Sequence, residues 1–196
     1  MNAGFIDIHT HHKKSGVVSP KMEGIHPWDA EKSLPLPDFT DCDIIGETGL
    51  DYAADVDRDA QERVFCAHLE AAEMMQKPVV LHVVRSFEPV MKILSGYRLN
   101  GVVFHGFVGS VQQAKRCFEA GYYLSFGERS LRSAKTREVI AYAAANLIFC
   151  ETDDNPDIDI EEIYKETAKL RGITVDELRI QTIENYKKLM RYDSLA

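Results

Sequence analysis

Short apolar runs alternate with segments of helical periodicity along most of this chain. We expect strands at residues 4–9, 22–26, 43–48, 79–84, 101–106, 122–126 and 147–152. Most of these runs are continuously apolar, which is typical of parallel strands that are covered on both faces. The alternation of strand and helix therefore predicts an α/β fold built from βα units around a parallel sheet.

The helical segments carry start and stop signals. Asp57 can cap the first helix, and Thr174 with Glu177 fits a capping box, in which a hydroxyl and a carboxylate satisfy backbone donors reciprocally. Gly172 separates the last two helices. We expect helices at about residues 57–75, 133–145, 159–171 and 174–191, others that begin after Ser86 and Ser110, and a loop with at most one helical turn at 27–37.

Length and composition are those of an ordinary globular protein. A chain of 196 residues, 45% hydrophobic and 28% charged, is compatible with one domain over residues 1–196. No run approaches the roughly 20 apolar residues of a membrane span, and no basic region precedes an apolar stretch as in a secretory signal. Four widely spaced cysteines without a CxxC pair predict reduced structural thiols. We therefore expect a cytoplasmic protein with no membrane partner.

The charge balance limits the kinds of partner. With 23 basic and 31 acidic residues the formal net charge is −8. This argues against a broad basic surface that grips nucleic-acid backbone, and also against peripheral membrane binding. It does not exclude a local basic rim, or a bound metal that reverses the field inside a site.

Imidazoles and carboxylates occur at or just past the ends of five predicted strands. The carboxyl ends of parallel strands line one shared mouth, so these side chains are expected to gather there. Such nitrogen and oxygen donors suit Zn²⁺, Mn²⁺ or Fe²⁺ better than Mg²⁺. Six ligands exceed the needs of one tetrahedral zinc, which predicts two divalent ions. The candidate ligands are His9, His11, Glu47, His82, His105 and Asp153.

Each candidate alone has an alternative explanation. An HxH pair is common by chance in surface loops, and Glu47 is equally explained as a surface acid in a βα turn. A lone His82 or His105 in an apolar strand is more often a hydrogen-bonded core residue, and Asp153 could simply cap the next helix. Their joint placement favours a metal site. Within it Glu47 can bridge two ions, and Asp153 is the candidate to orient or deprotonate a water.

A series of motifs covers nearly the whole chain. They are FIDIHTH, GIHPW, IIGETGLDY, PVVLH, VVFHGFVGS, GYYLSFG, CETD and ENYKKLM. In this order they resemble the TatD family of metal-dependent hydrolases and DNases. The resemblance implies a TIM-barrel-like fold and Mg²⁺-, Mn²⁺- or Zn²⁺-dependent cleavage from DNA ends. It also implies that the family's ligands fall on the same six residues, with His26 at the substrate end of the pocket.

The sequence departs from the family pattern in three places. Only residues 12–23 separate His11 from Gly24, so the second family strand should be missing, leaving seven strands and an uncertain barrel closure. The family's histidine-x-arginine appears as His82-Val-Val-Arg85, which makes Arg85 either a phosphate contact or an exposed arginine at a helix start. The loop after Asp153 is shortened, so the substrate preference stays open.

Three functions are compatible with these observations. The first is a metal-dependent phosphodiesterase, most simply a deoxyribonuclease that trims DNA ends. The second is a hydrolase of a small phosphoester, amide or ester on the same site, modestly favoured by the acidic surface and short loops. The third is a catalytically silent barrel that binds metal, which the missing βα units suggest and the complete ligand set opposes.

Overall fold

The computed structural model describes residues 4–32 and 35–191, and the chain divides into two compact units. The central unit is Lys21–Phe104. The terminal unit combines Met1–Pro20 with His105–Ala196. Strand pairing is parallel within both units, as the sequence predicts. Whether the chain acts as a single domain stays a prediction.

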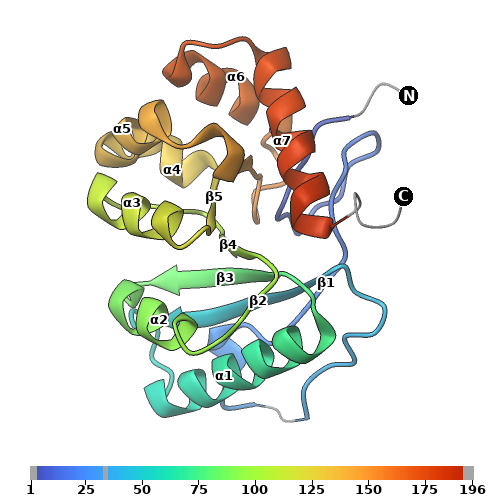
Figure 1. Ribbon diagram of the computed structural model, residues 1–196, viewed down its shortest axis with the longest axis vertical. Helices are drawn as coiled ribbons and strands as arrows, with labels where there is room; N and C mark the ends of the chain where they lie inside the picture. Colours follow the sequence, from blue (N-terminus) through green and yellow to red (C-terminus); the bar gives the residue numbers. More distant parts are fainter. Residues whose placement is uncertain (1–3, 33–34, 192–196) are drawn as a thin grey trace. The chain divides into compact units, whose positions relative to one another are not determined.

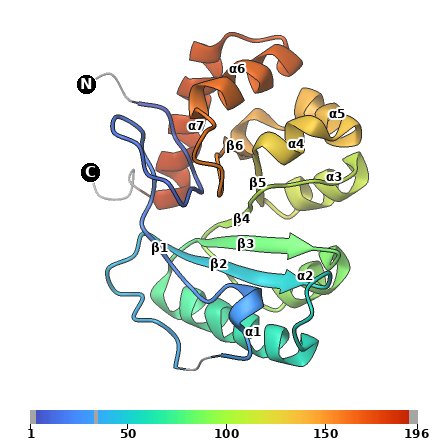
Figure 2. The same cartoon turned by 180° about the vertical axis from the view of Figure 1, so that it is seen from behind.

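The central unit is a parallel sheet with helices against it. Its strands pair in chain order and are β1 (Met22–Glu23), β2 (Ile44–Asp51), β3 (Val79–Val84) and β4 (Val102–Phe104). Helices α1 (Arg58–Met75) and α2 (Phe87–Leu94) lie on one side of β2 and β3 (Figure 1). The short 3-10 turn η1 (Pro27–Asp29) lies beside β2 and α1 (Figure 2). Seven of the eight residues of β2 and the first three of β3 are buried.

The terminal unit packs helices around two parallel strands. The strands are β5 (Tyr123–Phe126) and β6 (Ile148–Cys150). The helical elements around them are α3 (Val111–Glu119), α4 (Glu128–Arg132), α5 (Ala134–Tyr142), η2 (Ala145–Leu147), α6 (Ile160–Arg171) and α7 (Val175–Met190). Figure 1 shows these helices grouped about β5. In the described residues no helix is both long and apolar enough to cross a membrane.

Helix starts follow the predicted signals with one exception. The Asp57 carboxylate accepts the Ala60 N–H at 2.8 Å, and capping boxes form at Ser110 and at Thr174. Ser86 occupies the position before α2, but its hydroxyl donates to the Leu50 carbonyl of β2 and caps nothing. All four cysteines are free thiols, as predicted.

The strand predicted at residues 4–9 is not formed, which corrects the sequence-based prediction. This segment makes only isolated parallel bridges, Ile6 with Val18 and Thr10 with Asp153, so the described residues contain six strands and not seven. Its two bridges go to different segments, Val18 before β1 and Asp153 after β6, so neighbouring residues do not build one continuous ladder.

Tyr164 of α6 holds this N-terminal segment in place. Its buried hydroxyl donates to the Ile6 carbonyl at 2.9 Å and accepts the Ile6 N–H at 3.3 Å, with the Thr182 hydroxyl 2.8 Å away. Burial raises the pKa of Tyr164 well above its ordinary value, so the phenol stays a neutral donor. One side chain thus satisfies both backbone groups of a residue that lies outside any regular ladder.

We predict that Tyr164→Phe lowers the free energy of unfolding by about 1–3 kcal/mol, because two buried backbone groups lose their partner. Urea denaturation followed by circular dichroism measures this change. Tyr142→Phe is the matched control, since Tyr142 is 82% exposed, and it should leave the midpoint unchanged. Equal midpoints for Tyr164→Phe and the parent chain would show that this hydroxyl does not anchor the segment.

Candidate metal centre

Each unit contains a group of imidazole and carboxylate side chains. In the terminal unit, His9, His105 and Asp153 each offer a donor atom, and these atoms lie within 4.8 Å of one another. We call this group the terminal cluster. The central cluster is a group of the same kind, made of His26, Glu47 and His82. Both donor sets match the nitrogen and oxygen ligands of divalent transition metals.

Backbone hydrogen bonds fix the terminal cluster. Asp153 donates its N–H to the His9 carbonyl at 3.1 Å, and its own carbonyl accepts the His11 N–H at 2.9 Å. The Asp7 carboxylate accepts both the backbone N–H and the hydroxyl of Thr152, at 3.1 and 2.7 Å. The segment carrying both histidines is thereby attached to the segment carrying the carboxylate, although the two are far apart in sequence.

The donor atoms of this cluster differ in exposure. His9 Nε2 lies 3.5 Å from Asp153 Oδ1, and the His9 side chain is 5% exposed. His11 Nε2 lies 3.9 Å from the same oxygen, but its side chain is 53% exposed. His11 therefore forms the solvent side of the cluster and His9 its buried side.

A buried carboxylate stands behind His105. Glu151 Oε1 lies 3.4 Å from His105 Nδ1, and the Glu151 side chain is almost completely buried. A carboxylate facing Nδ1 leaves Nε2 as the ring nitrogen for a metal. Glu151 Oε2 is also buried and has no hydrogen-bond partner within the described part of the chain. A cation nearby would offset the cost of burying this charge, so the residues present fit a divalent ion.

Asp7 adds a second buried carboxyl group to the terminal unit. Burial raises the pKa of Asp7 to about 7, while the two hydrogen bonds from Thr152 act in the opposite direction. Glu151 raises this pKa further through charge repulsion. The cluster is thus surrounded by acidic groups for which a nearby positive charge would be favourable.

His82 is the centre of the central cluster. Its Nδ1 lies 2.7 Å from Glu47 Oε1, and its Nε2 lies 3.2 Å from Asp51 Oδ2. His26 Nε2 lies 3.3 Å from both His82 Nδ1 and Glu47 Oε1. The Trp28 indole N–H donates to Asp51 Oδ2 at 2.7 Å. Carboxylates therefore face both ring nitrogens of one histidine.

Asp51 fixes the orientation of His82. Burial raises the pKa of Asp51, but hydrogen bonds from Trp28, Ala53 and His82 outweigh it, so the net pKa lies below the ordinary value. An ionised Asp51 accepts the Nε2–H of His82 and leaves Nδ1 directed at Glu47. Asp51 and Glu151 thus play the same part in the two clusters.

Glu47 and His82 are set by the pairing of β2 with β3. Gly49 of β2 is in register with His82 of β3, and its φ is 142°. A Cβ atom at Gly49 would lie 2.1 Å from the His82 carbonyl oxygen. Only glycine permits this close approach of the two strands beside the cluster.

The structure groups most of the predicted site residues, unit by unit. His9, His105 and Asp153 form the terminal cluster with His11 beside it, and Glu47 and His82 belong to the central cluster. His26, predicted to bind substrate, is part of that second cluster as a third donor. Arg85 is exposed just beyond β3 and belongs to neither group. The ligand assignments themselves stay predictions.

Two carboxylates behind the histidines, Asp51 and Glu151, were not singled out by the sequence reasoning. Asp51 lies four residues after Glu47 on β2, but the register of β2 is irregular between Ile45 and Thr48. Glu151 and Asp153 both lie beyond the end of β6. The even spacing of residues on a regular strand therefore gave no reliable signal for either carboxylate.

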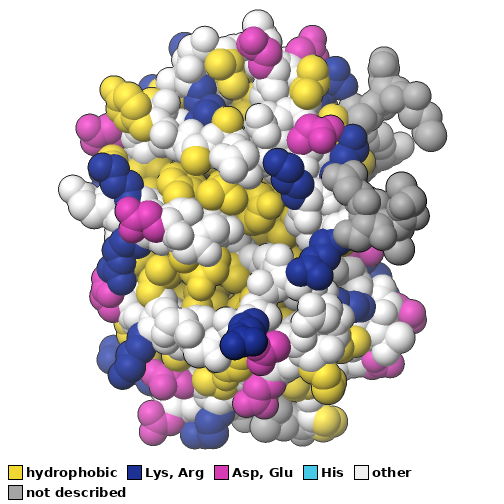
Figure 3. All heavy atoms as spheres, in the orientation of Figure 1, with side chains coloured by type: hydrophobic (Ala, Val, Ile, Leu, Met, Phe, Trp, Pro, Cys, Tyr) yellow, Lys and Arg dark blue, Asp and Glu magenta, His cyan; other side chains and the backbone are white. Residues whose placement is uncertain are grey.

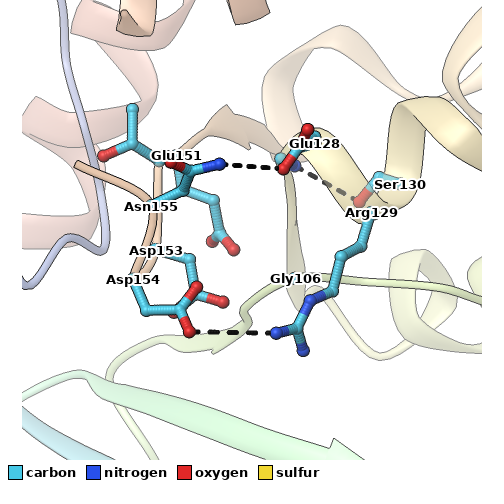
Figure 4. Close-up of a pocket in the computed structure, with 10 residues that line it drawn as sticks. Gly106, Glu128, Arg129, Ser130, Glu151, Asp153, Asp154 and Asn155 are labelled. Carbon is cyan, nitrogen blue, oxygen red and sulfur yellow. Dashed lines mark hydrogen bonds and ion pairs between the residues drawn. The ribbon is translucent and has the colours of Figure 1, made fainter. Parts of the chain in front are cut away.

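A pocket of the terminal unit opens beside Asp153. Figure 4 shows Glu151, Asp153 and Asp154 on one side of it and Arg129 reaching across from α4. The Arg129 guanidinium lies 3.9 Å from the Asp154 carboxylate. Asn155 donates to Glu128 at 3.1 Å across the same opening. The lining is acidic, which suits a cation better than an unaccompanied phosphate.

Comparisons with known proteins identify relatives of this chain. A family model described as TatD related DNase matches residues 7–191. An uncharacterized metal-dependent hydrolase of Bacillus subtilis, YabD, is 30% identical over 164 residues, covering 75% of this chain and 64% of the relative. The 3'-5' ssDNA/RNA exonuclease TatD of Salmonella typhimurium is 30% identical over 146 residues, with 66% and 55% covered. The chain therefore spans less than two thirds of the length of each of these two relatives.

Solved structures show the fold. The TatD homologue YJJV of Escherichia coli superposes with a TM-score of 0.82 at 22% identity, covering 96% of this chain and 98% of that one. A TatD family hydrolase of Entamoeba histolytica gives a TM-score of 0.74 at 15% identity, with 88% and 74% covered. These likenesses confirm the predicted TIM-barrel-like α/β class.

We predict that Gly49→Ala lowers the free energy of unfolding by about 1–3 kcal/mol or more, because the added methyl group meets the His82 carbonyl at a φ that alanine rarely adopts. Urea denaturation provides the measurement. Gly96→Ala is the control, since the nearest atom to its Cβ would be 3.4 Å away, and it should cost far less. Equal stabilities of the two variants would show that the strands tolerate a wider spacing at Gly49.

Proposed function

The chain belongs to the TatD-related DNase family, and on that premise we propose that it is a metal-dependent phosphodiesterase that removes nucleotides from DNA ends. The observation that carries the proposal is the pair of donor clusters, each with a buried carboxylate behind one of its histidines. The names of relatives support nucleic acid as the substrate, because one is called a 3'-5' ssDNA/RNA exonuclease and another a putative deoxyribonuclease.

Two divalent ions are part of the proposal, one for each cluster. His9, His11, His105 and Asp153 supply the ligands of the first ion. Glu47 and His82 supply those of the second, with Asp51 orienting His82. The share of imidazole favours Zn²⁺ or Mn²⁺ over Mg²⁺.

The proposed reaction is hydrolysis of a phosphodiester by water. A divalent ion held by these ligands would make a bound water more acidic and offset the charge on the phosphoryl group. Asp153 accepts the proton that the attacking water loses. The water oxygen forms a bond to phosphorus, the bond from phosphorus to the sugar oxygen breaks, and that oxygen takes up a proton. In the central unit, His26 and Arg85 are the proposed substrate-binding residues; His26 would donate through Nε2, because its Nδ1 accepts the Trp28 N–H.

The backbone holds Asp153 for this role. Two hydrogen bonds to the segment of His9 and His11 keep it in a left-handed conformation that costs a non-glycine residue free energy. Its Oδ1 then lies 3.5 Å from His9 Nε2 and 3.9 Å from His11 Nε2.

Hydrolysis of a small phosphoester is the second candidate. On the face that Figure 3 draws, Lys and Arg side chains are interspersed with Asp and Glu side chains. A surface of mixed charge and a net charge of −8 do not favour binding of the phosphates along a long nucleic-acid strand. The comparison that separates the two candidates is cleavage of an oligonucleotide against cleavage of bis(p-nitrophenyl) phosphate by the same preparation.

We predict that metal-stripped protein regains stepwise shortening of a labelled single-stranded oligonucleotide when Mn²⁺ or Zn²⁺ is added. Asp153→Ala and His82→Ala should each lower kcat at least about 100-fold, because the first removes the proton acceptor and the second a ligand. Gel electrophoresis of timed samples measures both effects.

The controls for this assay are His12→Ala and Asp157→Ala. Both residues are exposed and lie outside the two donor groups, so both variants should cleave like the parent chain. Full activity of Asp153→Ala and His82→Ala at the same added metal concentration would contradict the mechanism. Cleavage of only the small diester would move the assignment to the second candidate.

We also predict about two bound Mn²⁺ or Zn²⁺ ions per chain after dialysis, falling to about one in His105→Ala and in His82→Ala and to none in the double variant. Elemental analysis of the dialysed proteins gives these ratios. His12→Ala, which changes an exposed histidine outside both clusters, should keep both ions. A ratio of one in the parent chain would disprove the second ion.

A further inference from the structure

Trp28 is the single tryptophan of the chain, and its side chain is 59% exposed beside the central cluster. Isolated exposed apolar residues are normal on protein surfaces and need no explanation by themselves. What distinguishes Trp28 is that its ring is both held rigidly and placed next to the candidate ligands.

Three features fix the indole. Its N–H donates to Asp51 Oδ2 at 2.7 Å, and the Trp28 backbone N–H donates to His26 Nδ1 at 3.2 Å. The preceding Pro27 is buried and opens the η1 turn, where its ring restricts the backbone. The polar edge of the indole is therefore hydrogen-bonded to Asp51 beside the central cluster, while more than half of the residue's surface faces solvent.

The ring contacts of Trp28 do not include a parallel stack. Its centroid lies 4.7 Å from that of His26 and 6.1 Å from that of His82, with interplanar angles of 79° and 72°. Both contacts are edge-to-face, so neither imidazole lies parallel to the indole. An aromatic ligand ring can still stack on the exposed part.

We propose that Trp28 stacks on a nucleobase of a single-stranded substrate whose phosphate is bound at the central cluster. The inference rests on the proposed function and specifies its substrate class. Stacking on an aromatic side chain is tolerant of sequence, because every base has a π-face. The acidic net charge leaves backbone electrostatics a small share of the affinity, so stacking has a correspondingly larger share.

A purely structural role is the competing explanation, because the indole N–H also positions Asp51 and, through it, His82. Two substitutions separate the explanations. Trp28→Phe and Trp28→Leu both remove the N–H donor, but only phenylalanine keeps an aromatic face. A base-stacking role predicts different KM values for the two variants, whereas a positioning role predicts equal ones.

The experiment combines these variants with the fluorescence of Trp28. The Mn²⁺-loaded parent protein is titrated with a phosphorothioate single-stranded oligonucleotide that resists cleavage, and with the same strand carrying abasic terminal nucleotides. We expect quenching by the first strand and at least about 5-fold weaker binding of the abasic strand. In cleavage of the ordinary strand, Trp28→Leu should raise KM about 5- to 100-fold, and Trp28→Phe much less.

The possible outcomes separate this inference from the proposed function. Cleavage of the ordinary strand without base-dependent quenching, or equal KM values for the two variants, would overturn the stacking role and leave the nuclease intact. Base-dependent quenching without cleavage would support Trp28 as a base-binding residue and reject the nuclease. A protein that neither cleaves nor shows quenching would overturn both.

Discussion

A buried carboxylate that faces one ring nitrogen of a histidine is the interaction on which both clusters depend. Asp51 meets Nε2 of His82, and Glu151 meets Nδ1 of His105. Each carboxylate selects which ring nitrogen carries the proton and which is left for a ligand. Against the effect of burial, hydrogen bonds from Trp28, Ala53 and His82 lower the pKa of Asp51, whereas Glu151 Oε2 has no hydrogen-bond partner among the described residues. A bound cation would offset the burial of both carboxylates, so each cluster favours a cation.

Unusual local backbone geometry places the donor residues of both clusters. Asp153 is held at positive φ by hydrogen bonds to the segment carrying His9, and Gly49 allows β2 to approach β3 at His82. Tyr164 supports the first of these arrangements from α6 by satisfying both backbone groups of Ile6. Regular elements thus bring the donor residues near one another, and irregular residues set their final orientation.

The sequence predicted the elements well, because apolar runs and capping residues are local signals. Helix α1 begins after Asp57 as expected, and the capping box at Thr174 is present. The expected strand at 4–9 was wrong, since its bridges are divided between Val18 and Asp153, and no local pattern reveals such a division. The donor residues were found from their places after strands. Asp51, Glu151 and Trp28 were missed as partners, because their roles arise from contacts between separate segments and not from residue type.

The central claim is that the two clusters are metal sites, and crystals soaked in Mn²⁺ test it most directly through anomalous diffraction. The account predicts one anomalous peak bonded to His105 Nε2 and Asp153, and another bonded to His82 Nδ1 and Glu47, with Asp51 and Glu151 still hydrogen-bonded behind the histidines. Crystals that show ordered side chains at both clusters but no anomalous peak at either, even at millimolar Mn²⁺, would contradict it.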